Sequence, residues 1–233
     1  EPEVVSVLPA SGTIGSVITV AGTGYAVNDS LTVAFGINTN IQQAAANSNG
    51  SFSLTFTIDT QVFGTTTIAV AGAATASNRF IILPQVDSVI PVSGTVGTIV
   101  TIRGNGYAAG DAITVAFGTN AGIQTAVTGQ YGSFIASWTV DVQRYGTTTI
   151  MASGVGTATN VFRIMPAVDS VMPTIGTVGM NITISGTGYA ANDKLNIAFG
   201  TKTSIQTAIA GSYGSWTSSF TIDTQVYGST LIT

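Results

Sequence analysis

The chain has 233 residues, of which only 7% are charged, and its formal net charge is −4. Soluble domains usually carry about 25% charged residues, so this chain is expected to present a neutral surface rich in hydroxyl groups. With six basic residues it supplies no cationic field for a phosphate backbone or an anionic lipid, which argues against nucleic acid as a partner. Cysteine and histidine are absent, and this excludes disulfides, thiolate chemistry and the usual Ser–His–Asp or histidine–metal sites.

A fixed period runs through the whole chain. The segment at positions 11–15 returns at 93–97 and again at 175–179, so the period is 82 residues. No insertion or deletion interrupts the register, and self-similarity of this kind indicates a repeat architecture. A unit of this size can bury a core of its own, unlike shorter repeats that must stack. We therefore expect three modules, at residues 1–84, 85–166 and 167–233.

Alternating apolar and polar residues predict short β-strands, because successive side chains of a strand point to opposite faces of the sheet. In chain order, the first copy has these inward rows: Ile18 and Val20; Leu31, Val33 and Phe35; Phe52, Leu54, Phe56 and Ile58; Thr66, Ile68 and Val70; Phe80 and Ile82. Gly22–Gly24 and Asn49–Gly50 are expected to be turns with positive φ. No apolar stripe of helical period is present, so helices should be scarce. With about seven strands per copy, the predicted fold is all-β, a tandem array of three immunoglobulin-like β-sandwich modules.

One inward row places large rings in every copy. In the second copy it reads Phe134, Ala136, Trp138 and Val140, and in the third it reads Trp216, Ser218, Phe220 and Ile222. We expect the two tryptophans to be core residues, because they lie on the inward side of the alternation.

The joints between the copies are short. They read Leu83-Pro84-Gln85 and Met165-Pro166-Ala167. Proline fixes its own φ and pushes the preceding residue toward extended geometry, whereas a flexible linker would be longer and richer in Gly or Ser. Modules of about 30 to 40 Å then predict a semi-rigid rod of about 100 Å or more.

Aspartates return at three positions of the repeat: Asp29, Asp111 and Asp193; Asp59, Asp141 and Asp223; Asp87 and Asp169. Because Asp near a turn hydrogen-bonds its own backbone, we interpret them as turn formers. A calcium site needs several carboxylates close together, and none of these residues has an acidic neighbour. No catalytic residue, cofactor or metal ligand is therefore expected. Gly22-x-Gly24 is not followed by a helical pattern, so it is interpreted as a turn and not as a dinucleotide loop.

Tyrosines and sequons are the remaining candidates for binding or modification. Tyr25, Tyr107 and Tyr189 follow the same turn in each copy and either stack on sugar rings or, more plainly, cap an edge of the core. Asn28, Asn49 and Asn181 head Asn-x-Ser/Thr sequons, which are candidates for glycosylation, although roughly three are expected by chance in this composition.

The third copy ends before its last strand. Three full periods (3 × 82) need 246 residues, and the chain has 233. The missing counterpart contains Val161–Ile164, so we expect module 3 to expose apolar core and unpaired backbone groups. Either the array continues, or another subunit donates a strand. The candidate donor segment holds Val4, Val5, Val7 and Leu8.

The sequence also resembles a known family. The runs Val86–Pro91, Ser93–Gly97 and Val100–Tyr107 look like the opening of an IPT/TIG immunoglobulin-like domain, and Gly132–Phe134 and Tyr145–Thr148 resemble its secreted bacterial versions. The likeness covers essentially the whole chain. It implies a fold rather than an activity, because this family serves receptors, transcription factors, starch-acting enzymes and microbial surface arrays.

Two function classes follow, and neither is enzymatic. The first is an extracellular structural protein, a subunit of a filament, sheath or surface layer, whose partners are copies of itself or neighbouring surface proteins. Sparse lysine on the expected sheet edges favours this class, because isolated sandwiches normally guard their edges with charge. The second is an adhesin stalk or a carbohydrate-binding module of a larger secreted protein. Both place the chain at the cell surface or beyond, with no stretch long enough to span a bilayer.

Overall fold

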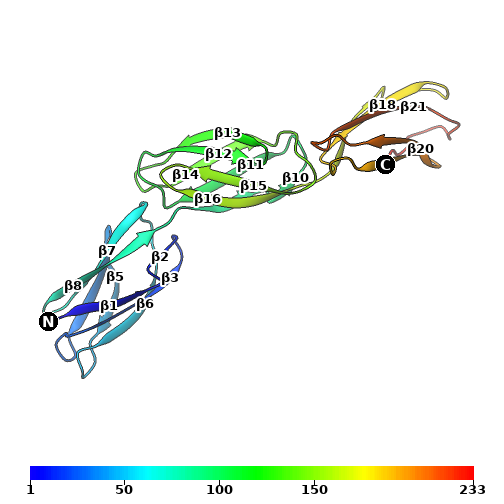
Figure 1. Ribbon diagram of the computed structural model, residues 1–233. Coiled ribbons are helices and arrows are strands. Elements are labelled where there is room, and N and C mark those ends of the chain that lie inside the picture. The colour runs from blue at the N-terminus through cyan, green and yellow to red at the C-terminus, as the bar shows by residue number, and fades with distance from the viewer.

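The computed structural model describes residues 1–233 and contains strands, turns and loops but no helix. The predicted all-β class is therefore confirmed. Figure 1 shows three β-sandwich modules that follow one another end to end, with the N-terminus on the first module and the C-terminus on the third.

Module 1 pairs a three-stranded sheet, β1-β3-β6, with a five-stranded sheet, β2-β8-β7-β4-β5. Its strands are β1 (Glu3–Leu8), β2 (Ser11–Gly12), β3 (Val17–Thr23), β4 (Ser30–Phe35), β5 (Asn38–Ala45), β6 (Phe52–Thr57), β7 (Gly64–Ala71) and β8 (Thr75–Ile82). All pairs are antiparallel except β2 with β8, which run parallel. This distribution of consecutive strands over two facing sheets is immunoglobulin-like.

Module 2 repeats the same topology, with sheets β14-β11-β9 and β10-β16-β15-β12-β13. Its strands are β9 (Gln85–Ile90), β10 (Ser93–Gly94), β11 (Ile99–Asn105), β12 (Ala112–Phe117), β13 (Asn120–Val127), β14 (Phe134–Thr139), β15 (Gly146–Ser153) and β16 (Thr157–Ile164). The short strand β10 pairs with β16 in parallel, as β2 does with β8. Modules 1 and 2 therefore have eight strands each, one more than the sequence pattern suggests.

Module 3 has the sheets β17-β18-β21 and β19-β20. Its strands are β17 (Ala167–Met172), β18 (Asn181–Thr187), β19 (Lys194–Phe199), β20 (Lys202–Ile209) and β21 (Trp216–Thr221). Ile232 forms a single bridge to Phe199 at the position where β7 pairs with β4 in module 1. The second sheet therefore has two strands where modules 1 and 2 have five.

The cores lie between the paired sheets and consist of the residues that the alternation predicts. Every apolar member of the five inward rows of module 1 is buried, and modules 1 and 2 each bury a cluster of 17 apolar residues. Module 3 buries seven. Aromatic rings meet edge-on or tilted at the centre: Phe35 with Phe56, Phe117 with Trp138, and Phe199 with Phe220, at centroid distances of 5.4, 5.6 and 5.4 Å. Trp138 and Trp216 are 6% and 7% exposed, which confirms their prediction as core residues.

The glycines at the predicted turns play two different roles. Gly24 and Gly50 have φ values of 80° and 69°, as turn residues should. Gly22, in contrast, lies within β3, and a Cβ there would collide with the carbonyl oxygen of Glu3 and the ring of Phe52. The interpretation of Gly22 as a positive-φ turn residue is therefore wrong, because this position is glycine for close packing.

The joints are shorter than the sequence suggests. Strand β8 ends at Ile82 and β9 begins at Gln85, so only Leu83 and Pro84 lie outside the strands. In the second joint only Met165 and Pro166 do. The last residue of each expected linker, Gln85 or Ala167, is already the first residue of a strand in the following module.

Candidate functional site

Most of the repeated aspartates accept hydrogen bonds within their own module. The carboxylates of Asp29 and Asp111 each accept a hydrogen bond of 2.8 Å from a backbone N–H of a turn, at Ala73 and Val155. A second set, Asp59, Asp141 and Asp223, accepts from the side-chain amide of the residue two positions on, at 2.8, 2.8 and 2.6 Å. None of these bonds is to the backbone of the aspartate's own turn, because Ala73 and Val155 lie 44 positions from their acceptors, so the turn-former interpretation stays a prediction. No three His, Cys, Asp or Glu side chains come together in a way that could hold a metal ion.

Two of the three repeated tyrosines, Tyr25 and Tyr107, cap the core and are not displayed on the surface, whereas Tyr189 is half-buried. Tyr107 is 0% exposed, and its hydroxyl donates to the carbonyl of Ala152 at 3.0 Å. Tyr25, 7% exposed, makes the same bond to Val70 at 3.1 Å. Burial raises the pKa of all three tyrosines, that of Tyr107 to about 12. A ring covered in this way offers no face for a sugar to stack on, so the plainer interpretation of these residues holds for Tyr25 and Tyr107.

The two joints between modules are built alike. The N–H of Phe63 in module 1 donates to the carbonyl of Tyr107 in module 2 at 3.0 Å. At the next joint the N–H of Tyr145 donates to the carbonyl of Tyr189 at 2.9 Å. Phe63 and Tyr145 occupy the same position of the repeat, and so do the two acceptors. The same atoms therefore hold each pair of neighbouring modules.

Glycine permits the close approach at both joints. A Cβ on Gly106 would lie 2.6 Å from the carbonyl oxygen of Leu83, and a Cβ on Gly188 would collide with that of Met165. Both glycines have positive φ, 72° and 76°. The linker backbone consequently passes directly against the turn that precedes each tyrosine, which limits the freedom of the joint.

Side-chain amides close one open side of every sandwich. Gln42, Gln124 and Gln206 lie on β5, β13 and β20, the edge strands of the second sheet. Each donates from Nε2 to a carbonyl of the facing sheet, at Thr55, Ser137 and Ser219, over 3.3, 2.7 and 3.0 Å. Each Oε1 also accepts the N–H of the next residue, which would otherwise be free at the edge.

Asparagine does the same on the opposite side of modules 1 and 2. Asn78 and Asn160 lie on β8 and β16 and donate from Nδ2 to the carbonyls of Val4 and Val86, at 3.0 and 2.9 Å. Their Oδ1 atoms accept the next N–H at 2.8 Å. These amides blunt the edges without charge, so scarce lysine does not by itself leave the edges open to neighbours. Sequence reasoning missed them, although their return at the same repeat position was visible.

The candidate donor segment is not free. Val4, Val5, Val7 and Leu8 form part of β1, which pairs with β3 of the same module. Val4 and Val7 are 4% and 8% exposed in the core of module 1, and only Val5 and Leu8 face solvent. The prediction of an available N-terminal donor is therefore not supported, because withdrawing β1 would open module 1.

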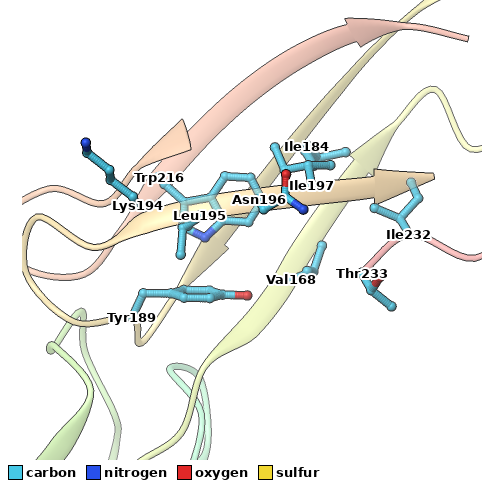
Figure 2. A pocket seen from close by; sticks show the side chains of 10 residues that line it. All are labelled: Val168, Ile184, Tyr189, Lys194, Leu195, Asn196, Ile197, Trp216, Ile232 and Thr233. Atoms are coloured by element: carbon cyan, nitrogen blue, oxygen red, sulfur yellow. The ribbon is translucent and has the colours of Figure 1, made fainter. Parts of the chain in front are cut away.

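Module 3 has a groove with a mostly apolar lining. A cavity of about 250 Å³ opens beside Tyr189 and Trp216, whose rings meet edge-on at 5.8 Å (Figure 2). Val168 in its lining is 41% exposed, whereas its counterparts Val4 and Val86 are 4% and 6% exposed. The groove lies where strands equivalent to β7 and β8 cover the core of module 1. Lys194 is the only charged residue of the lining, so the groove has no acid–base pair.

The sequon asparagines are all accessible. Asn28 lies in a turn with φ of 60°, Asn49 in the turn before β6, and Asn181 at the start of β18. All three are exposed, and their glycosylation stays a prediction.

No protein-family model and no curated protein matches the chain, so the IPT/TIG resemblance is not confirmed. Three of the solved structures that it is similar to illustrate the level of likeness. A structure described with a xylogluco-oligosaccharide is 14% identical over 100% of this chain and 59% of the other, with a TM-score of 0.33. The BSP domain of a biofilm-associated protein is 22% identical over 69% and 29%, with a TM-score of 0.26. A 1.5-MDa bacterial ice-binding adhesin is 13% identical over 100% and 94%, also with a TM-score of 0.26.

The chain thus spans 59% and 29% of the length of the first two proteins. The structure has no helix that could cross a membrane.

Proposed function

We propose that this chain is a non-enzymatic structural element of the cell exterior, in which immunoglobulin-like modules form a stiff spacer for a filament, sheath or surface layer. The observation that carries the proposal is the repeated joint, in which the same N–H and the same carbonyl join modules 1 and 2 and modules 2 and 3. A two-residue linker containing proline and a glycine packed against its backbone restrict each joint further. If every joint has the same geometry, each module is rotated by the same angle relative to the one before it. The modules then follow a regular path along the array.

The surface chemistry supports an exterior location. Few charges, many hydroxyl groups and three exposed sequons suit a neutral scaffold that meets other neutral surfaces. The same rod would serve as an adhesin stalk, with recognition elsewhere. A carbohydrate-binding role has no support at Tyr25 and Tyr107, whose rings are buried.

Strand donation is the finer form of the filament proposal. The candidate donor segment Val4 to Leu8 is already used in module 1, where it pairs with β3. Donation through it would therefore require exchange of β1 between chains. We favour an array whose modules are connected by the repeated joint over one that exchanges β1 between chains. Withdrawal of β1 would expose the buried side chains of Val4 and Val7.

Distances between spin labels test the repeated joint. The chain has no cysteine, so single cysteines can be introduced at will. Ser48, Gln130 and Ser212 are exposed and occupy the same repeat position. Labels at 48 and 130, and in a second protein at 130 and 212, should give the same narrow distance distribution, near one module length of about 30 to 40 Å.

A broad distribution, or two clearly different ones, would refute the stiff spacer. As the matched control, a Gly-Ser insertion after Leu83 should broaden the first distribution and leave the second unchanged. Negative-stain microscopy of native material then separates the two structural roles, since a filament subunit gives polymers and a stalk gives single rods.

A further inference from the structure

In modules 1 and 2 the strands through which the chain enters are bonded directly to the strand through which it leaves. Module 1 is entered through β1 and β2 and left through β8, which leads into module 2 (Figure 1). Two backbone hydrogen bonds flank the short parallel ladder of each module. They are Ile81 N–H to Ala10 C=O at 3.1 Å and Leu83 N–H to Gly12 C=O at 2.9 Å, repeated as Arg163 to Val92 at 3.0 Å and Met165 to Gly94 at 2.8 Å.

A third bond of each set comes from a side chain. The amide of Asn78 ties β8 to the carbonyl of Val4 in β1, and that of Asn160 ties β16 to Val86 in β9. Each module therefore has at least three bonds between its entering and leaving strands, and we call these three bonds the clamp.

The direction of the strands decides how the clamp responds to tension. Because β2 and β8 run parallel, pulling the chain from both sides moves one strand backward and the other forward along their own axes. All clamp bonds are then loaded together and must break together. In an antiparallel hairpin pulled at its open end, the bonds are loaded one after another and each breaks at low force. The parallel pairing of β10 with β16 gives module 2 the same geometry.

We propose that modules 1 and 2 are load-bearing units, in which the clamp resists tension applied along the array. The relevant quantity is the rate of forced unfolding, which depends on the barrier and not on equilibrium stability alone. Gln124 provides the contrast, because its amide makes the same kind of bond but joins β13 to β14, neither of which carries an end of the module. The proposal deepens the structural role argued above.

Single-molecule extension of the full chain at constant force tests the clamp. Modules 1 and 2 should unfold as two equal, slow steps, each releasing roughly 70 residues or about 240 Å of chain between the clamped strands. Asn160→Ala removes one clamp bond and should raise the unfolding rate of one of the two steps about fivefold at the same force. The other step, from unaltered module 1, serves as the reference in the same molecule.

Gln124→Ala is the matched control. It should lower the thermal stability of module 2 about as much as Asn160→Ala does, yet change the forced-unfolding rate less than about twofold. The reciprocal pair Asn78→Ala and Gln42→Ala repeats the comparison in module 1. The clamp is refuted if the asparagine and glutamine variants speed forced unfolding equally, or if the asparagine variants leave it unchanged. Neither result bears on the stiffness of the joints, which the label distances test separately.

Discussion

Tyr107 offers a test of how much a buried hydroxyl, apart from its ring, contributes to a module. The side chain is fully buried, donates to the carbonyl of Ala152 at 3.0 Å and packs edge-on against Phe134 at a centroid distance of 5.4 Å. Tyr107→Phe keeps the ring and removes the hydrogen bond, leaving a buried acceptor without this partner. We expect the free energy of unfolding of module 2 to fall by about 1 to 2 kcal/mol.

The effect should depend on pH in a defined direction. Burial raises the pKa of Tyr107 to about 12, whereas an unfolded tyrosine titrates near 10. Between these values the native state holds more protons than the unfolded state, so stability falls as pH rises. The contribution of Tyr107 is complete below about pH 10 and is lost toward pH 12. The stability gap between the parent and Tyr107→Phe should therefore narrow with rising pH.

Tryptophan fluorescence isolates the relevant module. The chain has two tryptophans, and Trp216→Phe leaves Trp138 in the core of module 2 as the only reporter. Phenylalanine is the natural residue at the matching position of the other modules, Phe52 and Phe134. Urea denaturation in this background is then compared at about pH 8 and pH 11. Tyr25→Phe is the control, because it loses the same bond in module 1 and should leave the Trp138 transition unchanged.

Two outcomes would refute the reasoning. If Tyr107→Phe unfolded within about 0.5 kcal/mol of its parent at pH 8, the hydrogen bond would not contribute as its burial requires. If the gap stayed constant between pH 8 and pH 11, the raised pKa of Tyr107 would be wrong.

The remaining predictions concern the core, β1 and the joint. Phe56→Ala, Trp138→Ala and Phe220→Ala should each cost about 3 to 5 kcal/mol in their own module, measured by chemical denaturation; a Trp138→Ala protein within about 1 kcal/mol of the parent would contradict its core position. Deleting Glu1–Pro9 should accelerate hydrogen exchange throughout module 1 and leave module 2 protected, because β1 supplies part of that core. If protection in module 1 persisted, β1 would be dispensable there. Gly106→Val should broaden the label distances across the first joint only, since its Cβ meets the linker carbonyl at 2.6 Å; an unchanged distribution would show that the close approach does not fix the joint.

Local sequence patterns were enough to predict most of the strands and their buried faces. The row Phe52, Leu54, Phe56 and Ile58 is buried as its alternation predicts, because a period of two commits a strand to one face whatever its partner is. The return of these rows after 82 residues indicated similar modules along the chain.

The side-chain and joint contacts described above could not be predicted, because they join residues that lie far apart in the sequence. Asn78 and Val4 are 74 positions apart, and no alternation or spacing indicates that an amide on one strand reaches a carbonyl on the facing sheet. The packing of Val4 and Val7 in their own module was hidden for the same reason, since apolar residues near a terminus look alike whether they pack within their own module or in another chain. The joint bonds from Phe63 and Tyr145 were also invisible, because they use backbone atoms, which every residue has.

By itself, the sequence determined the repeat, the strands, the inward faces and the poverty of reactive groups, all of which depend on residue type and local order. Only the tertiary structure decided which strands pair across a module, which amides close its sides and which atoms meet at the joints. These features arise when segments far apart in the chain are brought within hydrogen-bonding distance, and that proximity is set by the packing of whole sheets. The parallel pairing of β2 with β8 is the clearest case, because two residues, Ser11 and Gly12, are enough to tie the entrance of a module to its exit.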